Sequence, residues 1–108
     1  MNTLVSAVTN GTTITVSPVS VGGKSIQSVI NSAPSGYTIV FTPGTYKISH
    51  VIGLKSGVSL EGQANAKLLS DGRSGIFEGL GVKNTTISGF IFDGKHGGPG
   101  GGLRRDLS

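Results

Sequence analysis

Three side chains that could carry acid-base chemistry lie within four consecutive residues: Asp93, Lys95 and His96, separated by Gly94. An imidazole is a competent general base near neutral pH. Strand alternation would also place Asp93 and Lys95 on the same side. However, Phe92-Asp93-Gly94 is typical of a turn in which the aspartate accepts backbone N–H groups, with Lys95 and His96 in a solvated tail. The sequence favours the turn and assigns no catalytic residue beyond these three candidates.

Candidate ligand-binding groups are Glu61, Tyr46 and Arg73. Tyr46, like Tyr37, could stack on a sugar ring, although tyrosines in such positions also pack at corners. Glu61 could contact a sugar, or could pair with Asp93 across stacked segments as the two carboxylates of a glycoside hydrolase do. Because Glu61 precedes a glycine, an exposed corner residue is the alternative.

A calcium site would need several oxygen ligands, and Asp71 with Glu78 supplies at most the beginning of one. We expect no metal site and no cofactor, with Ca²⁺ as the alternative to test. The chain has no cysteine, which excludes disulfides and thiolate metal sites.

Composition limits the partners. At 108 residues the chain has the length of one domain, and its nine Lys and Arg against five Asp and Glu give a net charge of +4. These basic residues are scattered and not interleaved with aromatic ones, so we expect no nucleic-acid partner. A mildly basic surface could attract an anionic polysaccharide. The sequence shows no secretory signal and no apolar run long enough for membrane insertion.

Three β-rich segments, 38–49, 57–70 and 84–94, repeat one short pattern with glycine-bearing corners such as Pro43-Gly44, Ser56-Gly57, Glu61-Gly62 and Ser88-Gly89. Aligning them predicts two stacked apolar columns: Ile48 with Leu69 and Ile91, and Phe41 with Leu60 and Ile87. Similar strands at a nearly constant period indicate a solenoid whose coils share one core. Residues 36–94 are therefore predicted to form about three coils.

The N-terminal residues differ from the repeat. Residues 1–23 alternate Thr, Val and Ile around Asn10-Gly11, which predicts a β-hairpin or an edge strand. Residues 24–35 predict a short helix that Ser25 caps and Pro34 ends, because apolar residues recur at helical spacing at positions 26, 29, 30 and 33. A helix at this place would cap the first coil.

The C-terminal end has no such cap. Residues 95–108 are glycine-rich and without periodicity, and are predicted to be a flexible tail. The last coil would then expose an assembly interface that consists of Ile87, Phe90, Ile91 and Phe92. We expect a homo-oligomer, or continuation of the solenoid by another chain or segment.

The segment SIQSVINSAPSGYTIVFTPGTYKIS (25–49) resembles the N-terminal start of right-handed parallel β-helix proteins of the pectate-lyase-like superfamily, and residues 24–94 as a whole share the likeness. Those proteins begin with I-Q-x-x-I-x-x-A followed by G-x-T-I-x-x-x-P-G-T-Y. The resemblance implies that fold. It also implies that any catalysis uses acidic groups on a sheet face several coils further along. The family includes polysaccharide lyases, pectin esterases, sugar epimerases, phage tailspike depolymerases and surface adhesins.

The predicted fold is thus an all-β, right-handed parallel β-helix of about three coils with one N-terminal capping helix. The predicted function is a non-catalytic module of a polysaccharide-associated protein, located outside the cell, on the cell surface or in a virion. Two alternatives remain. One is a structural solenoid that stacks through its C-terminal coil into oligomers or filaments. The other is a fragment of a polysaccharide lyase, epimerase or depolymerase, because one scaffold hosts many chemistries.

Overall fold

Stacked strands form a β-solenoid of about three turns with one helix, which confirms the predicted fold class. The computed structural model describes residues 2–70, 76–79 and 81–94. In chain order the elements are β1 (Leu4–Asn10), β2 (Thr13–Val19), β3 (Lys24–Ser25), α1 (Ile26–Ser32), β4 (Thr38–Phe41), β5 (Gly44–Ile48), β6 (Ile52–Gly53), β7 (Ser59–Gly62), β8 (Ala66–Ser70), β9 (Phe77–Glu78), β10 (Ile87–Ser88) and β11 (Ile91–Gly94). The tail predicted at 95–108 lies outside the described residues.

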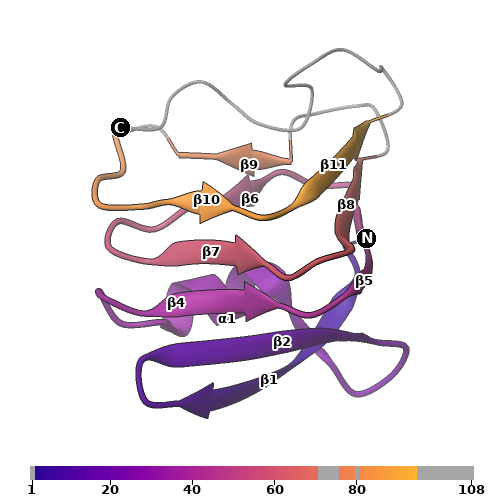
Figure 1. Ribbon diagram of the computed structural model, residues 1–108, viewed down its shortest axis with the longest axis horizontal. Coiled ribbons are helices and arrows are strands. Elements are labelled where there is room, and N and C mark those ends of the chain that lie inside the picture. Colours follow the sequence, from indigo (N-terminus) through magenta and orange to yellow (C-terminus); the bar gives the residue numbers. More distant parts are fainter. Residues whose placement is uncertain (1, 71–75, 80, 95–108) are drawn as a thin grey trace.

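The strands form three sheets (Figure 1). Successive coils add β4, β7 and β10 to the first sheet, β5, β8 and β11 to the second, and β6 and β9 to the third. The first sheet has the order β10-β7-β4-β2-β1-β3, the second β11-β8-β5 and the third β6-β9. Pairing between coils is parallel, as in β4 with β7 and β5 with β8. Because side chains alternate along a strand, each coil turns one set of residues inward and the other outward.

The predicted register of the apolar columns is confirmed for one pair, Leu60 with Ile87, and is wrong for the other residues. Ile39, rather than Phe41, stands in register with Leu60 and Ile87 in the first sheet. In the second sheet Ile48 pairs with Ser70, whereas Leu69 pairs with Lys47 and Asp93. The alignment assumed a large apolar residue at the same place in every coil, but the second coil has small residues at two of these places.

Gly62 is the clearest of these small residues. It pairs with Phe41 in the first sheet, and a Cβ added to it would lie 2.8 Å from the Phe90 ring. The space that it leaves lets Phe41 and Phe90 meet edge to face, with ring centroids 5.0 Å apart. Glu61-Gly62 therefore lies at the end of β7 and is not the corner that the sequence predicted.

The helix is shorter than its predicted range at both ends. Lys24–Ser25 forms β3, which pairs antiparallel with β1, and α1 begins at Ile26. Ser25 is the N-cap, since its side chain accepts a hydrogen bond from the Ser28 backbone N–H at 3.1 Å. Ala33 is extended, with φ −74° and ψ 127°, because the following Pro34 disfavours a helical residue before it.

The N-terminal residues cover the first coil on all three sides. In the first sheet β2 pairs with β4, while α1 lies behind β4 in Figure 1. In the second sheet Thr3 exchanges two hydrogen bonds with the Lys47 backbone, at 2.9 and 2.7 Å. In the third sheet the Gln27 amide accepts from the Gly53 N–H at 2.7 Å and donates to its carbonyl at 2.9 Å. Every strand of the first coil thus has its N-terminal edge hydrogen-bonded.

Candidate functional site

Hydroxyl side chains line the outward face of the first sheet. Ile14, Val16, Ile39, Phe41 and Leu60 of β2, β4 and β7 are buried, so the residues that alternate with them point outward. Register places Thr13, Thr38 and Ser59 in one row, and Thr15, Val40, Glu61 and Ser88 in the next. Because neighbouring strands are about 4.8 Å apart, the Thr and Ser hydroxyls of these rows form an array of groups that both donate and accept hydrogen bonds. The apolar Val40 interrupts this array, and Glu61 adds an acceptor to it. This surface, the hydroxyl face, has no predicted residue except Glu61.

Glu61 lies on β7 between Val40 and Ser88 and is exposed. It forms no ion pair with any residue that the structure describes. Its carboxylate is available as a hydrogen-bond acceptor within the hydroxyl face. The sequence identified Glu61 from its residue type alone, whereas the accompanying hydroxyls become visible only when the strand register is known.

Tyr46 is a core residue rather than a sugar-binding one. Its side chain is 0% exposed, its ring packs edge to face on Phe41 at 5.1 Å, and its hydroxyl donates to the Thr42 carbonyl at 2.6 Å. Burial raises the pKa of the Tyr46 phenol above its ordinary value, and the hydrogen bonds with Thr42 oppose that shift. A fully covered ring has no face to offer a ligand.

Asp93 lies in strand β11 and not in the predicted turn. Its carboxylate is 3.3 Å from the Lys67 ammonium, and both side chains are about half exposed. Glu61 and Asp93 stand on different sheets, so the structure does not bring this carboxylate pair together. The other candidates Lys95, His96 and Arg73 fall outside the described residues.

The described residues do not bring together the ligands that a calcium site would need. Asp71 lies outside the described residues, and Glu78 is a half-buried residue of β9. Within residues 2–70, 76–79 and 81–94, no three acidic, histidine or cysteine side chains lie close enough together to hold a metal ion. No helix among the same residues is long and apolar enough to cross a membrane.

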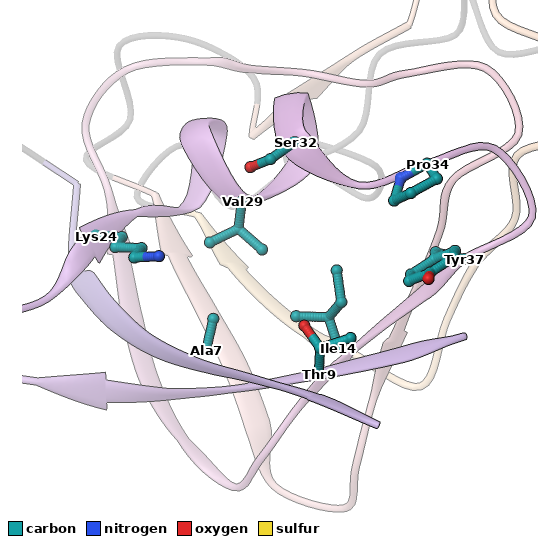
Figure 2. A pocket seen from close by; sticks show the side chains of 8 residues that line it. All are labelled: Ala7, Thr9, Ile14, Lys24, Val29, Ser32, Pro34 and Tyr37. Carbon is teal, nitrogen blue, oxygen red and sulfur yellow. The ribbon is translucent and has the colours of Figure 1, made fainter. Parts of the chain in front are cut away.

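A pocket of about 320 Å³ lies between the β1–β2 hairpin and α1 (Figure 2). Its lining consists of Ala7, Thr9, Ile14, Lys24, Val29, Ser32, Pro34 and Tyr37. Of these residues the sequence singled out only Tyr37 as a ligand-binding candidate. The hairpin, the helix and the following loop are separate in sequence, so no local pattern indicates that they enclose a common space.

The predicted assembly residues lie at the last described coil, but they face different ways. Ile87 and Phe90 are partly buried against the core. Phe92 is in register with the buried Leu68 and Tyr46, so it points inward, and it is nevertheless 41% exposed. Ile91 points outward from β11 and is 47% exposed. The exposure of Phe92 arises because the described residues place no further coil on it.

By its fold, this chain is a β-solenoid whose N-terminal end is capped. Comparison with protein-family models, with curated proteins and with solved structures finds no match to this chain.

Proposed function

We propose that this chain is a non-catalytic β-helix module of a polysaccharide-associated protein, built on the pectate-lyase-like pattern. The hydroxyl face carries the proposal. Two rows of outward side chains follow the solenoid axis at the strand spacing, and apart from Val40 they are Thr, Ser and Glu. Sugar hydroxyls need partners that can donate and accept hydrogen bonds. Such a module works outside the cell, on a cell surface or in a virion, where polysaccharides occur.

The arrangement of the carboxylates supports binding rather than hydrolysis. Glycoside hydrolysis uses two carboxyl groups that flank one bond. Glu61 belongs to the first sheet, whereas Asp93 belongs to the second and is paired with Lys67. A role as the leading part of a lyase, epimerase or depolymerase remains the related alternative, with the chemistry contributed by other coils.

The test is binding to a panel of immobilised neutral and acidic polysaccharides. The double variant Thr15→Val/Thr38→Val removes two hydroxyls from the hydroxyl face while keeping β-branched side chains of the same shape. Two lost hydrogen bonds should weaken binding about tenfold or more. The matched control is Thr45→Val, because Thr45 is an exposed residue of β5 in the second sheet. Absence of binding by the wild-type chain, or equal binding by the double variant, would refute the proposal.

A second candidate is self-assembly through the C-terminal coil, which the inward-pointing but exposed Phe92 favours. The strand edges of the first coil are already hydrogen-bonded at the N-terminal end. Among the described residues, no strand pairs with the far edges of β10 and β11. Contact between two C-terminal coils would give a closed dimer, whereas a filament would join β10 to the outer edge of β1, which β3 covers only at Leu4 and Val5.

A further inference from the structure

The pocket between the hairpin and the helix is lined by an apolar floor and a polar rim. Its apolar lining includes the buried Ile14 of β2 and Val29 of α1, together with Ala7 of β1. Figure 2 shows Lys24 and Tyr37 on opposite sides of this space, with Val29 facing Ala7 across it. A concave apolar floor with a few convergent polar groups is the usual form of a small-molecule site.

The pocket is open because the inward residues of β1 near its tip are the small Ala7 and the polar Thr9. Val5 is fully buried, whereas Ala7 is partly buried and Thr9 is exposed. The helix that faces them has only seven residues. No large side chain from either element therefore fills the space between them.

The polar groups of the rim have unused hydrogen-bonding capacity. The Lys24 ammonium forms neither an ion pair nor a hydrogen bond with any described residue. Neither the Thr9 hydroxyl nor the Tyr37 hydroxyl has a hydrogen bond within the same part of the chain. Ser32 donates to the Ser28 carbonyl and keeps its acceptor capacity.

These groups suit one kind of ligand. The cation attracts an anionic group, the half-buried tyrosine ring offers a face for stacking, and the free hydroxyls can bind further hydroxyls. A volume of about 320 Å³ is at the small end of ligand pockets, which suits one ring rather than an extended chain. A sugar ring that carries a carboxylate combines all of these features.

We propose that this pocket binds a single carboxylate-bearing sugar unit, with the carboxylate at Lys24 and the ring against Tyr37. The inference rests on the proposed function, because it gives the module a second site, specific for acidic sugars, at the capped end of the solenoid. The hydroxyl face lies on the outer side of the first sheet, whereas the pocket lies between the hairpin and α1, so the two sites can be disabled separately.

The experiment titrates the whole 108-residue chain with D-glucuronate and with D-glucose, which differ by the carboxylate alone, and follows backbone amide shifts by NMR. Glucuronate should shift the amides of residues 7–9, 24 and 37, and glucose should bind at least about tenfold more weakly. Acetate is a second probe. If acetate shifts the same amides at the same concentrations, recognition of a sugar ring is refuted.

Four variants, of which Lys47→Gln is the control, separate the charge from the shape of the pocket. Lys24→Gln should weaken glucuronate binding about tenfold or more, because a charge-assisted hydrogen bond is lost, and Lys24→Arg should retain most of it. Lys47→Gln, which removes the same charge from the exposed face of β5, should have no effect. Ala7→Leu should block the pocket, with a circular dichroism spectrum to check folding. Equal affinity in Lys24→Gln and wild type would refute the proposal.

The binding experiments distinguish refutation of the pocket proposal from refutation of the proposed function. If glucuronate does not bind but a polysaccharide still binds at the hydroxyl face, the pocket proposal is refuted and the proposed function stands. If glucuronate binds and no polysaccharide does, the proposed function is refuted, and the pocket is a site for free acidic sugars.

Discussion

At the scale of single residues, Gly62 shows how one missing side chain organises the core. Phe41 of the first coil and Phe90 of the third lie on either side of it, and their rings touch because nothing stands between them. Phe90 also lies 6.1 Å from Phe77 and 6.2 Å from Phe92, ring centroid to ring centroid. The glycine thus allows an aromatic cluster to connect three coils.

Adding a methyl group at this point should destabilise the fold. The new Cβ of Gly62→Ala would lie 2.8 Å from the Phe90 ring and 3.1 Å from the Gly89 backbone, so the ring must move. We expect the free energy of unfolding, measured by urea denaturation, to fall by about 1–3 kcal/mol. Gly53→Ala is the control, because its new Cβ would have its nearest contact at an ordinary 3.6 Å. Equal stability of the two variants would contradict the packing described around Phe90.

The buried Tyr46 predicts a loss of stability in alkali. Its pKa is raised in the folded state, so above about pH 10 the unfolded chain releases this proton more readily than the folded chain does. The contribution is fully present below the unfolded pKa and declines as the pH rises above it. Urea denaturation between pH 8 and 11.5 should show the decline in wild type.

Tyr46→Phe separates this proton from the other alkaline titrations. At pH 8 the variant should lose about 1 kcal/mol, because the hydrogen bond to the Thr42 carbonyl is gone. Its stability should then fall less steeply above pH 10 than that of wild type. Tyr37→Phe is the matched control, since Tyr37 is only partly buried. If the two variants have parallel pH profiles, Tyr46 is not the group responsible.

At the scale of secondary-structure elements, the helix does more than cover apolar surface. Gln27 hydrogen-bonds both backbone groups of Gly53, so one side chain replaces a neighbouring strand at the edge of β6. In return, the Lys55 ammonium of the coil donates to the Asn31 and Ala33 carbonyls, at 3.1 and 2.8 Å, at the end of α1. A cation at a helix C-terminus is favourable because it satisfies carbonyls that have no partner within the helix.

Removal of the Gln27 side chain should therefore uncouple the cap from the third sheet. Gln27→Ala leaves the N–H and the carbonyl of Gly53 without their partners, and we expect a loss of about 1–3 kcal/mol in the free energy of unfolding. Hydrogen exchange at the Gly53 amide should accelerate by a larger factor than exchange in β7. Gln63→Ala, at an exposed glutamine, should change neither quantity. Unchanged exchange at Gly53 would show that the cap is held in another way.

At the scale of the whole molecule, the two ends of the solenoid differ. The N-terminal end carries the hairpin, the helix and the hydrogen bonds of residues 2 and 3. The last described coil presents β10 and β11 with Phe92 partly uncovered. This difference favours association at the C-terminal coil over association at the capped end.

Size in solution tests this association. Light scattering over a range of concentrations should show dimers in wild type, and Phe92→Ser should shift the protein to monomer. The substitution should cost about 1–2 kcal/mol of stability, because the ring is 41% exposed but still packs on Phe77 and Phe90. Val8→Ser is the control, since Val8 is 66% exposed in the hairpin at the other end. Monomers at every concentration would remove the self-assembly candidate, and growing fibres would show that the capped end also associates.

Ile87→Asp tests the packing of the last coil, because it places a charge against the core. Ile87 is in register with the buried Leu60 and packs against the core, so a charge there should unfold the chain or abolish its oligomers, at a cost of at least about 2 kcal/mol. Circular dichroism and light scattering on the same sample separate the two effects. Normal folding and normal assembly would mean that the register of β10 is wrong.

Local patterns were enough to predict the class of fold. Recurrent β-rich segments with glycine at their ends predicted the solenoid, and apolar residues at helical spacing after a capping serine predicted the helix, because these signals depend only on neighbours in the chain. Glu61 was predicted as a candidate from its residue type in the same way, whereas Tyr46 was predicted as a ligand residue and is buried.

Only the tertiary structure shows which residues pair between coils and which residues form the hydroxyl face and the pocket. A strand shifted by one residue exchanges its inward and outward sides, so the hydroxyl face could not be deduced until β2, β4 and β7 were aligned. The pocket likewise needs Ala7, Val29 and Tyr37 from three separate segments. Strand identity is a property of local sequence, but the groups that meet across coils depend on contacts between residues 20 or more positions apart.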